Sequence, residues 1–300
     1  MPTPHFSSPY NFGAIPKQLS DYKSSKIVIL PVPYDATTSY KSGTRDGPGA
    51  IISASRSMEL FDEETNVNIS DIGLCTLDEL DVVVDPEKMA DRVYQTCQHL
   101  LNDSKTIVML GGEHSLSFGY ARALIEKYPK MSVLHIDAHS DLAFDNGGTK
   151  YDHGCVARRI SELCPIVQVG IRSISREDID YAKQKGIRIF YASDITHDKG
   201  NNWIAKVTSQ LTDDVYVTID VDALDISIMP SVGTPEPGGI QWYQLLELLK
   251  QTCANKNIIG FDVVELCPIP GNVAPDFAAA KIVKKLIAYA FAKKSNNKFK

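Results

Sequence analysis

Short apolar segments rich in β-branched residues alternate along this chain with longer segments of helical periodicity. Such alternation is typical of a parallel sheet with helices over both faces, because parallel strands need a crossover between them. The run Ile107-Val108-Met109-Leu110 is apolar at every position, as expected for a strand buried on both faces. Strands are predicted at Lys26–Val32, Thr106–Leu110, Ser132–Asp137, Ile166–Gly170, Ile187–Tyr191, Val215–Asp220 and Ile258–Val264. Helices are predicted at Pro48–Ser57, Pro86–Asn102, Ser117–Lys127, Arg176–Lys185, Gln241–Ala254 and Pro275–Lys293. The fold class is therefore α/β with a mainly parallel sheet.

One of these helices is marked at both ends. Ser175 followed by Asp178 resembles a capping box, with aspartate where glutamate or glutamine is usual. Gly186 stands where a glycine ends a helix, and the next strand follows at once. No change of composition divides the 300 residues, so we predict a single domain over residues 1–300. Residues 1–24 should form an irregular arm and residues 294–300 a frayed tail.

The charge balance and the lengths of the apolar segments exclude several classes of binding partner. The 31 basic and 37 acidic residues give a net charge of −6, which argues against a nucleic-acid or polybasic membrane surface. No apolar segment approaches the length of a transmembrane helix, and the first residues lack the pattern of a secretory signal. The six cysteines form no Cys-x-x-Cys pair and are interpreted as reduced thiols of a cytoplasmic protein.

Acidic and imidazole side chains follow four of the predicted strands. Ligands of open α/β sheets bind beyond the carboxyl ends of the strands, so these side chains should meet at one edge. They are His114 after the second strand, Asp137, His139 and Asp141 after the third, Asp220 and Asp222 after the sixth, and Glu265 after the last.

The pattern favours a metal site. Asp137, His139 and Asp141 alternate, which places them on one side of an extended segment. Together with His114, Asp220 and Asp222 they supply four carboxylates and two imidazoles, enough for two divalent ions that share ligands. A carboxylate-rich set favours hard ions, with Mn²⁺ preferred over Zn²⁺. Each motif alone is also compatible with a capped turn.

The remaining histidines receive structural interpretations. His135 lies in a strand on the same side as Asp137 and is interpreted as a core histidine or one that supports the ligands. His5, His99 and His197 lie outside the motifs and are expected at the surface.

The motifs together resemble those of the ureohydrolases, the manganese enzymes that include arginase and agmatinase. Their three signatures are similar to Gly-Gly-Glu-His-Ser at 111–115, Asp-Ala-His-Ser-Asp at 137–141 and Thr-Ile-Asp-Val-Asp-Ala-Leu-Asp at 218–225. The likeness extends to the segments 39–48, 233–239 and 262–265, and covers roughly residues 25–290. It implies an arginase-type three-layer sandwich, trimers or hexamers, and a small cationic guanidino compound as substrate.

The resemblance also assigns roles. It implies two Mn²⁺ per subunit. One would be held by His114, Asp137, Asp141 and Asp220, and the other by Asp137, His139, Asp220 and Asp222. Glu265 corresponds to the family's guanidinium-binding glutamate and His153 to its proton-shuttling histidine.

Elementary chemistry agrees with these roles. A guanidinium is a poor electrophile, and two metals sharing one water supply hydroxide at neutral pH. Asp141 can pass on the proton that the nucleophile releases, and a histidine such as His153 can exchange protons with solvent. A planar cation needs a doubly accepting anion, which Glu265 provides.

Several details favour agmatine as substrate, with urea and putrescine, a polyamine, as products. Arginases usually have aspartate between the two glycines and the histidine of the first motif, where this chain has Glu113. The Pro-Glu-Pro-Gly-Gly run at 235–239 is similar to the corresponding run of agmatinases. Ala143 stands where arginases have an asparagine that helps to hold the α-carboxylate, and alanine has no such donor. The chain departs from agmatinases at Cys155, at Cys267 and in the segment 229–232. Guanidinobutyrate and arginine stay open as substrates, as do hydrolysis of a different C–N bond and a non-catalytic metal-stabilised protein.

Overall fold

The central element is an eight-stranded sheet in which every neighbouring pair of strands is parallel. The structure is a computed structural model that describes the backbone of residues 8–295. The strand order is β4-β1-β5-β10-β9-β6-β7-β8. The strands are β1 (Ile27–Val32), β4 (Leu74–Thr76), β5 (Thr106–Gly111), β6 (Ser132–Ile136), β7 (Ile166–Ile171), β8 (Arg188–Tyr191), β9 (Asp214–Asp220) and β10 (Asn257–Val264). The predicted parallel α/β sheet is confirmed. A separate antiparallel ribbon pairs β2 (Phe61–Asp62) with β3 (Val67–Asn68).

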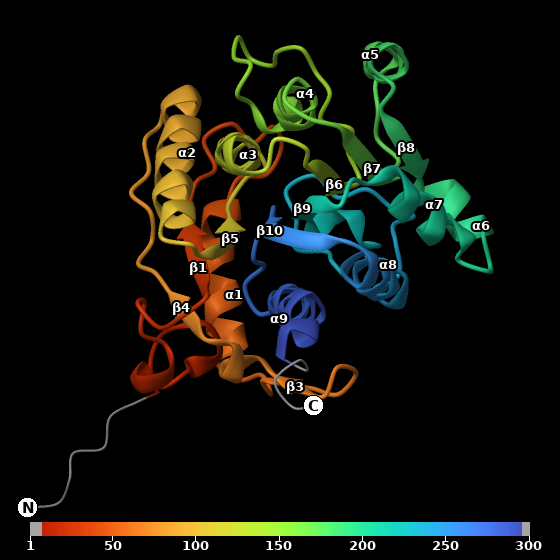
Figure 1. Cartoon of the computed structure of the whole chain (residues 1–300). Coiled ribbons are helices and arrows are strands. Elements are labelled where there is room, and N and C mark those ends of the chain that lie inside the picture. Colours follow the sequence, from red (N-terminus) through yellow and green to blue (C-terminus); the bar gives the residue numbers. More distant parts are fainter. Residues whose placement is uncertain (1–7, 296–300) are drawn as a thin grey trace, which may run out of the picture.

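Helices cover both faces of this sheet, which makes three layers (Figure 1). One layer contains α2 (Pro86–Asn102), α3 (Leu116–Lys127), α4 (Val156–Ser161) and α5 (Arg176–Lys185). The other contains α1 (Gly47–Ser55), α6 (Ala192–His197), α7 (Asn202–Gln210), α8 (Trp242–Asn255) and α9 (Ala274–Ser295). Short 3₁₀ turns lie at Phe12–Ala14, Lys17–Leu19, Thr44–Asp46, Ile69–Ile72, His153–Cys155 and Val221–Ala223.

Two apolar cores lie on opposite faces of the sheet, and alternate residues of each strand enter them. In β1, Ile27 and Ile29 pack in the core beneath α1, α8 and α9, whereas Val28 and Leu30 pack in the core beneath α2 and α3. This alternation follows from the twofold repeat of a strand. Burial on both faces explains why such strands are apolar at every position.

The predicted elements are all present, with ends that differ by at most two residues. Helices α2 and α5 have the predicted bounds. The Ser175 side chain accepts from the Asp178 amide, and Gly186 adopts a left-handed conformation at the end of α5, as expected. The sequence did not predict β4, α4, α6 and α7. Strand β4 has three residues and α4 and α6 have six each, too few for a periodic pattern. Helix α7 begins after Asn201 in a left-handed conformation without a side-chain cap.

The ends of the chain agree in part with expectation. Residues 8–24 are irregular apart from two 3₁₀ turns, and Phe12 and Ile15 of this arm are buried in the core. The frayed tail was expected from residue 294, but helix α9 continues through Ser295. Residues 1–7, which include His5, and residues 296–300 lie outside the described part.

The sheet order brings the predicted ligand-bearing segments together. Strands β5, β10, β9 and β6 are consecutive neighbours in the sheet. Because they are parallel, the segments that follow them leave from one edge (Figure 1). His114, Glu265, Asp220 and Asp137 stand on these four segments.

Glycine at position 112 is required by the close approach of β5 to the segment after β1. A Cβ atom there would lie 1.9 Å from the Tyr34 carbonyl oxygen, which is backbone and cannot move aside. We expect Gly112→Ala to destabilise the protein by more than about 3 kcal/mol or to prevent folding. Gly49→Ala is the matched control, because its nearest neighbour is the Tyr10 hydroxyl at 4.0 Å and it lies in helix α1. Urea unfolding of both variants measures the difference. Equal stabilities would contradict this account of the Gly-Gly motif.

Candidate metal centre

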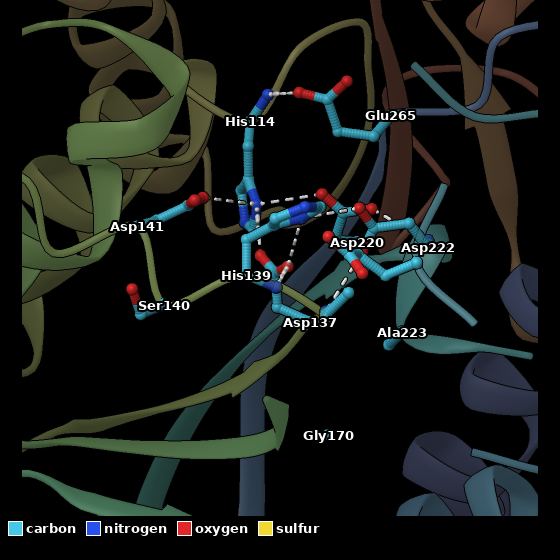
Figure 2. A network of polar contacts seen from close by, with 12 residues as sticks. His114, Asp137, His139, Ser140, Asp141, Gly170, Asp220, Asp222, Ala223 and Glu265 are labelled. Carbon is cyan, nitrogen blue, oxygen red and sulfur yellow. Dashed lines mark hydrogen bonds and ion pairs between the residues drawn. The ribbon is translucent and has the colours of Figure 1, made fainter. Parts of the chain in front are cut away.

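Six of the predicted side chains gather at the carboxyl edge of the sheet. Figure 2 shows the carboxylates of Asp137, Asp141, Asp220 and Asp222 turned toward the rings of His114 and His139. Asp137 and Asp220 both contact the same histidine nitrogen, so their carboxylates converge as the sequence required. Every one of the six predicted ligands therefore lies in this cluster.

The first group of ligand atoms surrounds the Nδ1 atom of His114. This nitrogen lies 3.0 Å from Asp137 Oδ2, 3.4 Å from Asp141 Oδ2 and 3.4 Å from Asp220 Oδ2. All four side chains are at most 9% exposed. These are the four residues that the resemblance assigns to one ion.

The second group is built around His139. Its Nδ1 atom lies 2.9 Å from Asp222 Oδ2 and 3.6 Å from Asp137 Oδ1. Asp137 thus contributes one oxygen to each group. Asp220, which the resemblance also expects to bridge, contacts His114 with one oxygen and accepts from the Asp222 amide with the other, at 2.9 Å.

Three buried atoms in the cluster form no hydrogen bond of good geometry among the described residues, although two of them, ring nitrogens, lie 3.0 and 3.1 Å from the third, a carboxylate oxygen. They are His114 Nδ1, His135 Nε2 and Asp137 Oδ2. Buried polar atoms are normally hydrogen-bonded, so three that crowd together without a hydrogen bond of good geometry fit a site that binds a cation. Donor atoms of imidazole and carboxylate type suit a divalent cation. The residues present therefore fit the metal that the family implies.

The charges of the cluster support the same conclusion. Burial and the neighbouring carboxylates raise the pKa values of Asp141 and Asp220 well above the usual value for aspartate. Burial also raises the pKa of Asp222, again with a contribution from Asp137. Buried carboxylates that repel one another in this way are stabilised by bound cations.

His135 is in direct contact with two residues of the cluster. Its Nε2 atom is 3.1 Å from Asp137 Oδ2, and its ring stacks on that of His114 with centroids 5.0 Å apart. Its Nδ1 atom faces the side-chain amide of Gln168 at 3.2 Å. The sequence placed it on the same side as Asp137, and the contact agrees with a supporting role. His99 and His197 are exposed, as expected.

A chain of buried hydrogen bonds orients His114. Its Nε2 atom lies 2.8 Å from the Thr218 hydroxyl, which donates to Asp262 at 2.7 Å. Asp262 also accepts from Ser117 and from the Tyr216 hydroxyl. With Nε2 held in this way, Nδ1 is directed at the carboxylates, as outer-sphere partners do for metal ligands. The sequence offered a signal for Asp262, since a charged residue inside a buried strand needs partners.

Glu265 and His153 lie together beside the cluster. The Glu265 carboxylate accepts from the backbone amide of His114 at 2.7 Å, and its Oε1 atom is 3.5 Å from His153 Nδ1. Burial opposes protonation of His153, but Glu265 raises its pKa to about 9. The two residues predicted to bind and to exchange protons with substrate are therefore adjacent.

Two of the site residues have strained backbones. Asp141 has φ 51° and Glu265 has φ 64°, in the left-handed region that non-glycine residues rarely adopt. Such strain concentrates at functional sites, because the surrounding structure must hold it. In this conformation the Asp141 carboxylate contacts the His114 ring, and the Glu265 carboxylate accepts from the His114 amide.

Arg172 is a residue of the centre that the sequence did not predict. Its guanidinium donates to the Asp222 carbonyl at 2.7 Å, to the Glu236 carbonyl at 2.7 Å and to the Pro237 carbonyl at 3.1 Å. It therefore ties the segment that carries Asp222 to the Pro-Glu-Pro-Gly-Gly segment. A clamp on carbonyl oxygens leaves no pattern in the sequence, because any residue supplies a carbonyl.

The cysteines lie in the interior of the molecule. All six are buried, and none forms a disulfide within the described residues. Cys155 lies close to His153 on the 3₁₀ turn His153–Cys155, and Cys267 donates to the Ser42 carbonyl over 3.5 Å. Two of the three departures from agmatinases, Cys155 and Cys267, thus lie close to the segments that carry His153 and Glu265.

A parallel sheet between two layers of helices, with a cluster of carboxylates and imidazoles at its carboxyl edge, defines an α/β protein whose residues could hold a divalent metal. Residues 25–288 match the profile of the arginase family. The chain belongs to the arginase family and is a ureohydrolase, a hydrolase of C–N bonds in linear amidines.

Named relatives agree with this membership. The chain is 36% identical to the N(1)-aminopropylagmatine ureohydrolase of Synechocystis sp., over 94% of this chain and 96% of the relative. It is 33% identical to the agmatinase of Pyrococcus horikoshii, over 88% of this chain and 91% of that one. Among solved structures, the agmatine ureohydrolase of Thermoplasma volcanium superimposes with a TM-score of 0.87 at 30% identity, over 97% of both chains.

Within the described residues, no helix has both the length and the apolar character needed to cross a bilayer.

Proposed function

We propose that this chain hydrolyses the guanidinium group of agmatine to urea and putrescine, with two Mn²⁺ ions in the cluster. The observation that carries the proposal is the Glu265 carboxylate, held at the edge of the cluster by the His114 amide at 2.7 Å. A buried carboxylate there is a partner for a planar cation whose central carbon must lie next to the cluster. The resemblance to ureohydrolases assigns the same role to Glu265.

The ligands in this proposal are those of the two groups. His114, Asp137, Asp141 and Asp220 would hold one ion, and Asp137, His139, Asp220 and Asp222 the other. Bound divalent ions lower the pKa of water from 15.7 to about 7, which makes hydroxide available at neutral pH.

The protein's own residues then complete the reaction. Glu265 binds the guanidinium and fixes the plane of its carbon. Asp141, at the edge of the cluster with a side chain 9% exposed, receives the proton that the attacking water releases. His153, beside Glu265, delivers a proton to the departing amine and regains it from solvent.

Ala143 supports a substrate without an α-carboxylate. It follows Asp141 by two positions, and its methyl side chain offers no hydrogen bond to a carboxylate. A buried carboxylate left without a donor costs about 1–3 kcal/mol. Agmatine differs from arginine by that group alone.

N(1)-aminopropylagmatine is the second candidate substrate. The observation that favours it is the 36% identity to the Synechocystis enzyme of that name. Both candidates carry the same guanidinium, so the cluster, Glu265 and His153 serve either one. The homo-oligomer, as a trimer or hexamer, and the cytoplasmic location stay predictions from the sequence.

A substrate panel tests the proposal. Purified chain loaded with manganese is assayed for urea with agmatine, N(1)-aminopropylagmatine, 4-guanidinobutyrate and arginine. We expect kcat/KM for agmatine to exceed that for arginine by about 30-fold or more. The reason is that Ala143 offers no hydrogen-bond donor to the α-carboxylate of arginine. A higher kcat/KM for N(1)-aminopropylagmatine would replace agmatine by the second candidate. Absence of urea from all four compounds would refute the proposal.

A further inference from the structure

The imidazole of His153 faces two different partners with its two nitrogens. Nδ1 points inward and lies 3.5 Å from Glu265 Oε1. Nε2 points outward and lies 2.7 Å from the Ser39 hydroxyl. The His153 side chain is 14% exposed, whereas Ser39 is an exposed residue. The ring therefore stands between the buried carboxylate and the protein surface.

The segment that carries Ser39 is fixed at both ends. At its start, Thr37 donates to the buried Glu113 carboxylate from its amide at 2.6 Å and from its hydroxyl at 2.5 Å. At its end, the Gly43 amide donates to the Asp35 carboxylate at 2.7 Å, and Arg45 pairs with the same carboxylate at 2.5 Å. Ser39 is thus presented by an anchored loop.

The same loop also holds the backbone of His153. The Thr37 hydroxyl accepts from the His153 amide at 3.0 Å. One residue of the loop therefore fixes the backbone of the histidine, and a second, two positions later, contacts its ring. Residues 37 and 153 are far apart in the sequence, so this double contact defines where the imidazole lies.

A serine hydroxyl suits the outward nitrogen chemically. A hydroxyl donates one hydrogen bond and accepts others, so it can pair with Nε2 whether that nitrogen carries a proton or not. When His153 gives up its Nδ1 proton, the neutral ring keeps a proton on Nε2 and donates it to the Ser39 hydroxyl. In the other tautomer Nε2 accepts from the same hydroxyl. A partner at Nε2 that keeps its hydrogen bond in both states holds the ring in place through the cycle.

We propose that Ser39 is a positioning residue for His153, and that its hydroxyl holds the imidazole ring in place between Glu265 and the protein surface. The inference rests on the proposed role of His153 in urea release. It assigns a function to Ser39 of the N-terminal motif, a residue that the metal cluster does not use.

Kinetics of Ser39→Ala test this inference. With the best substrate of the panel we expect kcat to fall about tenfold, the upper range for loss of one hydrogen bond, while KM changes less than twofold. Metal content should not change, since within residues 8–295 the Ser39 side chain hydrogen-bonds to His153 and to none of the ligands. Ser39→Thr keeps the hydroxyl and should recover most of kcat. The matched control is Ser42→Ala in the same loop, whose side chain makes no hydrogen bond in the described part of the chain.

A crystal structure of Ser39→Ala separates failure of this inference from failure of the proposed function. We expect the His153 ring to rotate away from Glu265, an outcome that does not depend on which substrate is turned over. The role of Ser39 would be overturned if the His153 ring did not move in Ser39→Ala. It would also be overturned if the wild type released urea and Ser39→Ala had the same kcat, or if Ser39→Thr did not recover the lost kcat.

Discussion

Asp137→Asn is expected to abolish urea release. Asp137 contributes one oxygen to each group of ligand atoms, at 3.0 Å from His114 Nδ1 and 3.6 Å from His139 Nδ1. An amide presents a neutral oxygen and an NH₂ group, so both positions lose a charged ligand at once. Loss of outer-sphere partners of a metal typically costs 10–100-fold, so loss of a shared ligand should lower kcat/KM by more than about 10³-fold.

The measurement is kcat/KM together with metal content by mass spectrometry after dialysis. Asp213→Asn is the matched control, because Asp213 is exposed in the turn before β9, at the opposite end of that strand from Asp220. Its activity and metal content should equal those of the wild type. Full metal content and turnover in Asp137→Asn would show that the cluster is not the centre of the reaction.

Glu265→Gln should give a different signature, in which activity is lost and metal is kept. The amide has the size of the carboxylate, and its oxygen can still accept from the His114 amide at this position. It has no charge to pair with a guanidinium, and its NH₂ group opposes the cation's own N–H donors. We expect kcat/KM to fall about 100-fold or more, since a charge-assisted pair in a buried site is replaced by a repulsive contact.

Glu79→Gln makes the same chemical change at an exposed position and should leave the rate unchanged. Metal analysis of Glu265→Gln separates substrate binding from metal binding. If Glu265→Gln retained full turnover with agmatine, the guanidinium would have to be bound elsewhere. If the chain released no urea and Glu265→Gln left turnover of another substrate unchanged, the alternative of a hydrolase that acts on a different C–N bond would be favoured.

The sheet could be predicted because its strands are buried on both faces. Runs such as Ile107–Leu110 have no polar position, and helices such as α2 and α5 carry their own caps. The missing elements lack such local signals. Strand β4 is three residues long and exists through its pairing with β1, a contact between segments more than forty residues apart.

The ligand set was predictable for a related reason. The carboxyl ends of parallel strands lie at one edge of the sheet, so the motifs after β5, β6 and β9 had to meet there. The residues that support the set were not predictable in the same way. Arg172 binds carbonyl oxygens, and Thr37 and Ser39 reach His153 from a loop more than a hundred residues away. Contacts of this kind depend on how the loops pack after the sheet has formed.

Anomalous diffraction from crystals grown with manganese tests the central claim most directly, because it locates bound ions without reference to activity. We predict two peaks per chain at the carboxyl edge of the sheet. One should lie among His114, Asp137, Asp141 and Asp220, and the other beside His139 and Asp222 with Asp137 between them. A chain that turns over substrate while its manganese lies away from these side chains would contradict the account.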